Sequence, residues 1–179
     1  MGLFGKLGSS LLDRSRSALE PVPAPEGPGA VCAPVAGRVV ALADVADPAF
    51  SQGMLGVGAG VAPEGDVAYA PVTGTVVAEV KTRHALLVRS EEGAEVLLHV
   101  GLDSVALRGE GFRQLVRKGD AVRAGQPVLA FDRALMAERG LDDTVVVTVT
   151  NPGDFARVEA LAAAGDEVGA GAPLLRCAR

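Results

Sequence analysis

The chain has 179 residues, 49% hydrophobic and 22% charged, which is the composition of a globular protein long enough to bury its own core. A net charge of −5 and an aromatic content of 3% argue against a surface for nucleic acid, so no nucleic-acid partner is expected. The sequence has no signal-peptide pattern and no apolar run long enough to span a bilayer, and its two cysteines form no CxxC pair; we therefore predict a cytoplasmic protein.

Residues 1–18 have the pattern of a short amphipathic helix, because Leu3, Leu7 and Leu11 recur at a spacing of four while charged residues fall elsewhere on the wheel. Residues 19–30 hold four of the chain's eleven prolines and are predicted to form a tether. A helix over residues 2–18 on such a tether would make a weak contact with the inner face of the membrane. A frayed tail, or a helix folded back on the domain, is the alternative.

Residues 31–179 are predicted to form one all-β domain, an antiparallel β-sandwich or barrel with internal quasi-repeats and a few short helices, because short β-rich runs alternate with turn residues. The expected strands are 37–42, 74–80, 85–89, 95–100, 127–131 and 144–150, and the expected helices are 133–139, with Gly140 as the C-cap, and 154–164.

Two internal repeats support a quasi-symmetric sandwich. The run APVAGRVV at 33–40 returns as APVTGTVV at 70–77, and GDAVRAGQP at 119–127 returns as GDEVGAGAP at 165–173. Each unit occurs twice, which is too few copies for a solenoid.

The only two histidines, His84 and His99, lie at opposite ends of a predicted hairpin. If its four-residue turn closes symmetrically, Arg89 faces Ala94 and His84 faces His99, with Cβ atoms about 5 Å apart; a slip of two residues leaves them roughly 7–8 Å apart. We therefore expect the two imidazoles to converge on a site, the alternative being two unrelated packed histidines.

Two imidazoles are too few for a zinc centre, so neither an intrinsic metal nor a cofactor is expected. They suit phosphoryl transfer, in which a neutral imidazole nitrogen attacks phosphorus and a neighbouring N–H stabilises the transferring group. The backbone carbonyl of Gly101 can fix the proton on one ring nitrogen of His99, and Thr82 can do the same for His84.

Three short runs carry a family resemblance: TRHA at 82–85, HVGLDSV at 99–105 and GEGF at 109–112. In this order they strongly resemble the glucose-type IIA component (glucose permease IIA domain family) of the bacterial phosphoenolpyruvate-dependent sugar phosphotransferase system. The likeness covers nearly the full chain, including the opening MGLF and the APV repeats.

The resemblance implies a phosphocarrier in which His99 accepts a phosphoryl group from phospho-HPr and passes it to a cysteine of a IIB domain, for uptake of a sugar of the glucose or N-acetylglucosamine type. It implies that His84 stabilises the phosphoryl group and that Thr82 orients His84. It also implies that the Gly101 carbonyl orients His99 and that Asp103 belongs to the site loop. Permeases or metabolic enzymes as regulatory partners are implied as well, and so is a metal shared by His84, His99 and a partner carboxylate.

Two other classes of protein share features with this sequence but lack support in its residues. A biotinyl or lipoyl carrier domain shares the Gly-Asp turns but needs an exposed lysine at a hairpin tip, and Lys81 lacks the expected neighbours. A zinc metallopeptidase of related architecture needs further ligands where this chain has Val88 and Gly101. Where the family often has aromatic side chains around its recess, aliphatic residues are expected to line it, with Phe50 retained; these are Val80, Leu86, Leu97 and Val100.

Overall fold

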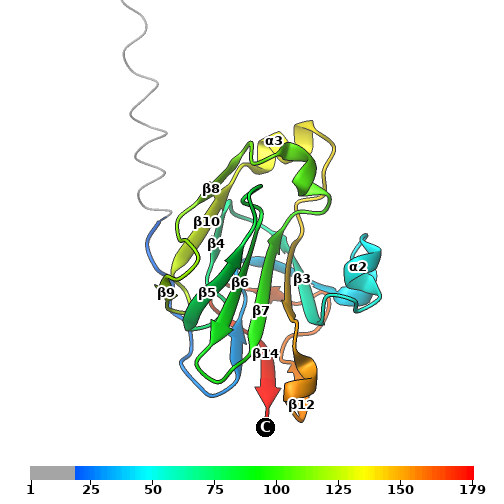
Figure 1. Cartoon of the computed structure of the whole chain (residues 1–179). Coiled ribbons are helices and arrows are strands. Elements are labelled where there is room, and N and C mark those ends of the chain that lie inside the picture. The colour runs from blue at the N-terminus through cyan, green and yellow to red at the C-terminus, as the bar shows by residue number, and fades with distance from the viewer. Residues whose placement is uncertain (1–18) are drawn as a thin grey trace, which may run out of the picture.

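A computed structural model describes residues 19–179 (Figure 1), and the amphipathic segment predicted over residues 1–18 lies outside the described residues. Short strands make up most of the regular secondary structure of the described chain. The strands are β1 (Ala30–Cys32), β2 (Gly37–Ala41), β3 (Val57–Pro63), β4 (Val67–Tyr69), β5 (Gly74–Glu79), β6 (Ala85–Ser90), β7 (Glu95–Val100), β8 (Phe112–Gln114), β9 (Ala121–Val122), β10 (Pro127–Phe131), β11 (Val145–Val149), β12 (Arg157–Ala160), β13 (Glu167–Val168) and β14 (Pro173–Ala178). The helices are α2 (Pro48–Ser51) and α3 (Arg133–Glu138), with short 3-10 turns at Leu42–Asp44, Ser104–Leu107 and Pro152–Asp154.

The strands form one large sheet in the order β13-β2-β3-β11-β7-β6-β5-β9 and two three-stranded sheets, β1-β14-β12 and β4-β10-β8. All the pairings are antiparallel. The two small sheets share with the large one a common core of mainly valine, leucine and alanine side chains. The predicted all-β sandwich is therefore confirmed.

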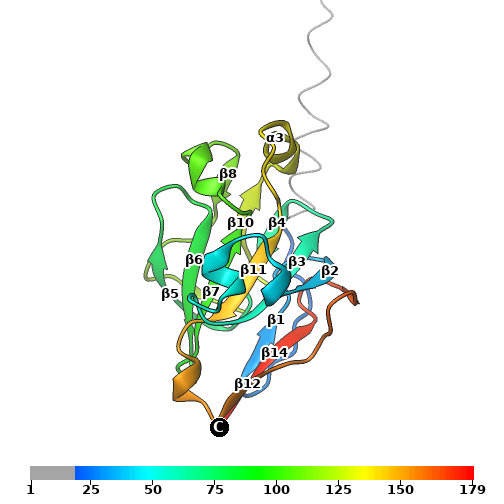
Figure 2. The same ribbon diagram turned by 90° about the vertical axis from the view of Figure 1, so that its right-hand side faces the viewer.

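Strand β7 shows how the sequence pattern positions the site. Its side chains alternate, so Val96, Leu98 and Val100 are fully buried in the main core while Leu97 and His99 lie on the other face. Each of the buried side chains contributes about 1.5–3 kcal/mol to folding. On the other face, Leu97 packs against a second small cluster with Phe50 of α2, which Figure 2 shows lying over this side of the sheet.

Several element predictions are confirmed and one is wrong. Strands 95–100 and 127–131 match β7 and β10, and α3 begins at the predicted residue with Gly140 just after its end at a φ of +69°. The helix predicted over 154–164 is wrong, because β12 occupies Arg157–Ala160 and pairs with β14. The edge of β14 supplies these residues with backbone hydrogen bonds that outweigh their helical propensity.

Part of the segment predicted as a tether is held against the domain. The Val22 N–H donates to the Gly125 carbonyl at 2.9 Å, and Ala30 already pairs in β1, one residue before the predicted start of the domain. The second glycine of each repeated turn makes room for this segment. A Cβ on Gly125 would lie 2.1 Å from the Val22 carbonyl oxygen, and a Cβ on Gly171 would lie 2.2 Å from the Pro23 carbonyl oxygen. Each repeat therefore needs its second glycine where the N-terminal segment crosses it.

Candidate functional site

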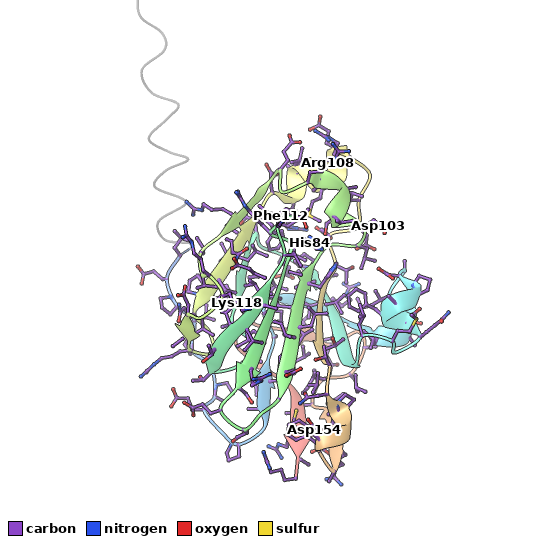
Figure 3. The ribbon with its side chains drawn as sticks, in the orientation of Figure 1. His84, Asp103, Arg108, Phe112, Lys118 and Asp154 are labelled. Atoms are coloured by element: carbon purple, nitrogen blue, oxygen red, sulfur yellow. The ribbon has the colours of Figure 1, made fainter. Side chains whose placement is uncertain are left out.

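His84 and His99 lie edge to face, with their ring centroids 4.7 Å apart and their planes at 80°. His99 comes from the central strand β7, between β6 and β11, whereas His84 lies in the bend that leads into β6. The only two imidazoles of the chain therefore adjoin one another at one end of the hairpin, where Figure 3 labels His84.

The register that brings the rings together differs from the predicted one. Ala85, not His84, pairs with His99, and Arg89 pairs with Glu95 instead of Ala94. The reason is the turn. The Ser90 N–H donates to the Ala94 carbonyl at 2.8 Å and the Ala94 N–H donates to the Ser90 hydroxyl at 3.0 Å, which leaves a three-residue loop ending in a glycine of positive φ. The prediction that His84 directly faces His99 is therefore wrong by one residue.

The backbone around Arg83 compensates for this shift. Arg83 has a φ of +61°, in the left-handed region, so the chain turns sharply just before β6. The His84 carbonyl still accepts a hydrogen bond from the Val100 N–H at 2.8 Å, which ties the bend to the end of β7. The His84 ring thereby reaches the face that carries His99 although the two residues are not register partners.

Both imidazoles are neutral at pH 7. Burial and the neighbouring His84 ring lower the pKa of His99 from 6.5 to about 4, against smaller opposing effects of the Gly101 backbone and the Asp47 carboxylate. Burial also lowers the pKa of His84, whose side chain is almost fully enclosed. A neutral imidazole keeps one nitrogen lone pair free, as a nucleophile requires.

The ring nitrogens of the two histidines have different environments. The Thr82 hydroxyl lies 2.8 Å from Nδ1 of His84, as the sequence predicts for that pair. Nδ1 of His99 is buried and makes no hydrogen bond of normal geometry among the described residues. The Gly101 backbone nevertheless acts on the ring and raises the pKa of His99, against the larger lowering by burial. Of the two ring nitrogens of His99, Nδ1 is the one that is both buried and without a hydrogen-bond partner in the described part of the chain.

The loop after β7 is shaped by Gly101. Its φ is +75°, and a Cβ there would lie 2.1 Å from Cε of Met136 on α3. The fully buried Ser104 hydroxyl donates to the Val100 carbonyl at 2.6 Å and closes the same loop. The motif glycine and serine thus hold the chain in a tight turn directly after the histidine.

Two acidic residues flank the site, and only one interacts electrostatically with His99. Asp103 is exposed at a φ of +55°, at the start of a 3-10 turn (Figure 3). The carboxylate that raises the pKa of His99 is Asp47, which also caps α2 by accepting from the Ala49 N–H at 2.9 Å. Sequence reasoning missed Asp47, although its position before Pro48 is a recognisable N-cap signal.

Two aromatic rings complete the walls of the site. Phe50 lies edge-on to His99 at 5.1 Å between centroids, and Phe112 lies 6.3 Å from His84 (Figure 3). Phe112 closes the GEGF motif, yet sequence reasoning did not assign it to the site. Of the aliphatic residues expected to line the recess, Leu86 and Val100 instead point into the main core.

The described residues contain no group of three or more His, Cys, Asp or Glu side chains that could hold a metal ion. A metal shared by the two histidines and a partner carboxylate stays a prediction. No helix in the described part of the chain is long and apolar enough to cross a membrane.

An antiparallel sandwich with two adjoining neutral imidazoles is the architecture of a IIA phosphocarrier, and the comparisons with known proteins agree. Residues 29–155 match the family described as phosphoenolpyruvate-dependent sugar phosphotransferase system, EIIA 1. The chain belongs to this family and is a phosphocarrier component of the sugar phosphotransferase system.

Its relatives include single components and longer chains. It is 37% identical to a glucose-specific EIIA component of Oceanobacillus iheyensis, with 72% of this chain and 78% of the relative covered. It is 44% identical to a beta-glucoside-specific EIIBCA component of Dickeya chrysanthemi over 79% of this chain, but spans only 22% of that relative's length. The solved structure of glucose permease IIA from Mycoplasma capricolum matches with a TM-score of 0.71 and 30% identity, covering 82% of this chain and 93% of that one.

Proposed function

We propose that Nε2 of His99 is the atom that carries the phosphoryl group. The observation that supports this most is the combination of a pKa near 4 with a buried Nδ1, which leaves a neutral ring with one accessible nitrogen. A proton on Nδ1 directed at the Gly101 carbonyl selects the tautomer whose lone pair is on Nε2. Attack by this lone pair forms the P–N bond while the bond from phosphorus to the donor breaks.

His84 has the complementary role in this proposal. If the Thr82 hydroxyl donates to Nδ1 of His84, the ring proton is on Nε2 and can be donated to a phosphoryl oxygen beside His99. The transfer needs no change of protonation at His84. The positive charge that develops on the phosphorylated His99 ring is balanced by its dianionic phosphoryl group, while the nearby Asp47 carboxylate favours the cationic ring.

The donor in this scheme is the phosphohistidine of HPr, and the acceptor is a cysteine thiolate of a IIB domain, in the cytoplasm at the inner face of the membrane. Relatives in which the EIIA region is part of a longer EIIBCA chain support a IIB partner for this domain. A sugar of the glucose or N-acetylglucosamine type, Asp103 as part of the site loop, and permeases or metabolic enzymes as regulatory partners stay predictions from the family resemblance.

The test is intact-mass spectrometry at neutral to alkaline pH after incubation with phosphoenolpyruvate, enzyme I and HPr. The wild type should gain one phosphoryl group that is lost in acid, as a phosphoramidate is and a phosphate ester is not. His99→Ala should gain none, whereas His84→Gln should be phosphorylated but fail to pass the group to a IIB domain. A phosphorylated His99→Ala variant would refute the assignment.

A further inference from the structure

A fully buried serine closes the loop that follows His99. Ser104 begins the 3-10 turn Ser104–Leu107, one residue after Asp103, which Figure 3 labels. Its hydroxyl donates to the Val100 carbonyl at 2.6 Å and lies 3.4 Å from the Gly101 carbonyl. Because a hydroxyl has a single proton, the shorter contact takes it and the Gly101 carbonyl keeps its capacity to accept from another donor.

The peptide group between Val100 and Gly101 is fixed at both ends. A trans peptide is planar, so its N–H and its carbonyl point in opposite directions. The Gly101 N–H donates to the Thr144 carbonyl at 2.9 Å, and the Val100 carbonyl on the other side accepts from the Ser104 hydroxyl. Removing the hydroxyl therefore frees one end of this peptide group.

The next peptide group sets the direction of the Gly101 carbonyl. The Leu102 N–H donates to the Asp142 carbonyl at 2.9 Å, so the Gly101 carbonyl points away from Asp142. The Gly101 backbone raises the pKa of His99, and Nδ1 of that ring is buried without a hydrogen-bond partner among the described residues. A carbonyl that accepts from a ring N–H has this effect on an imidazole, because it favours the protonated ring.

We infer that Ser104 is a positioning residue for phosphoryl transfer, because its hydroxyl fixes the loop in which the Gly101 carbonyl faces Nδ1 of His99. The inference rests on the proposed phosphorylation of Nε2. A carbonyl held in this way keeps the ring proton on Nδ1 and leaves the lone pair on Nε2. Without the hydroxyl, the Val100 carbonyl loses its partner and the loop can turn. The ring then also adopts the other tautomer, whose lone pair is on the buried Nδ1.

The expected effect is on the rate of transfer and not on the binding of the partner, because Ser104 is fully enclosed by the domain. Ser104→Ala should lower kcat for phosphorylation by phospho-HPr about fivefold to tenfold, as expected for the loss of one hydrogen bond, and leave KM unchanged. The matched control is Thr148→Val. The Thr148 hydroxyl is also fully buried and donates to the Leu55 carbonyl at 2.7 Å, away from the 100–104 loop, so this variant should melt earlier but keep kcat.

The tautomer would be measured on the full chain by nitrogen NMR of the imidazole rings at neutral pH, which needs no phosphoryl donor. The wild type and Thr148→Val should carry the His99 proton on Nδ1, whereas Ser104→Ala should show a mixture of tautomers. Ser104→Thr keeps a hydroxyl and should keep both the tautomer and kcat. If circular dichroism shows that the alanine variant does not fold, Ser104→Cys fills the space with a weak donor and should show the same mixture.

Four results would overturn the inference. The wild type could already carry the proton on Nε2, or Ser104→Ala could keep the wild-type tautomer. Ser104→Thr could behave like the alanine variant, or Thr148→Val could lower kcat as much, which would make a general loosening of the fold the cause. A wild type that takes up no phosphoryl group would refute the proposed function alone, because the change of tautomer in Ser104→Ala is measured without a donor.

Discussion

Acidification should weaken this fold through His99 in particular. Burial lowers the pKa of its ring to about 4 in the folded chain, against 6.5 in the unfolded one. As the pH falls below 6.5, His99 becomes protonated in the unfolded chain but stays neutral in the folded chain. The free energy of unfolding therefore decreases until the pH passes 4. The full difference corresponds to about 3 kcal/mol, of which about 2 kcal/mol is lost between pH 7 and about 4.5.

The measurement is urea unfolding of the wild type and of His99→Asn at pH 7 and at about 4.5. Other groups titrate in the same range, but they do so in both proteins and cancel in the difference. The wild type should therefore lose about 2 kcal/mol more than the variant on acidification. Parallel losses in the two proteins, or an NMR titration of the His99 ring with a midpoint near 6.5, would refute the reasoning from burial.

Three further substitutions test the walls of the site. Thr82→Val removes the 2.8 Å contact to Nδ1 of His84 and should slow transfer to IIB about fivefold in a quenched-flow assay with labelled phosphate, an effect of ~1 kcal/mol, while native melting is kept. Asp47→Asn keeps an N-cap for α2 but removes the charge, so the NMR-measured pKa of the acceptor ring should fall further; an unchanged pKa would contradict the assignment. Gly101→Ala should destabilise the fold by about 1–3 kcal/mol in urea, and the double variant with Met136→Ala should lose less than the sum of the two single losses, because the new methyl lies 2.1 Å from Cε of Met136.

The strands that could be read from the sequence are those in which alternation and turn residues agree. β7 alternates inward and outward residues along its whole length, and its bounds match the prediction. β3 was missed because its glycines resemble a loop. One of them, Gly58, is required by the sheet, since a Cβ there would lie 1.9 Å from the Val147 carbonyl oxygen. The close approach of β11 is a tertiary contact, and the local sequence of β3 does not reveal it.

The site could be predicted as a set of residues but not as a geometry. The motif runs identify both histidines, Thr82 and Gly101, yet the register depends on whether the turn holds three residues or four. The hydrogen bonds of Ser90 decide this, and the left-handed Arg83 restores the contact between the rings. Asp47 could not be found, because α2 approaches His99 only through the packing of Phe50.

The position of His99 links the stability of the fold to its chemistry. The residue lies on a strand with neighbours on both sides, and its partner in β11, Val146, is fully buried in the small cluster under α2. The packing that removes most of the ring from water lowers its pKa and so keeps it neutral at physiological pH. A phosphocarrier must present the same nitrogen first to a donor and then to an acceptor. Because the ring is already neutral and packed in place, each transfer requires only that the partner protein approach this nitrogen. The same burial accounts for the acid sensitivity predicted above. A variant of α2 that lets more water reach His99 should therefore both raise the pKa of the ring toward 6.5 and reduce the loss of stability in acid.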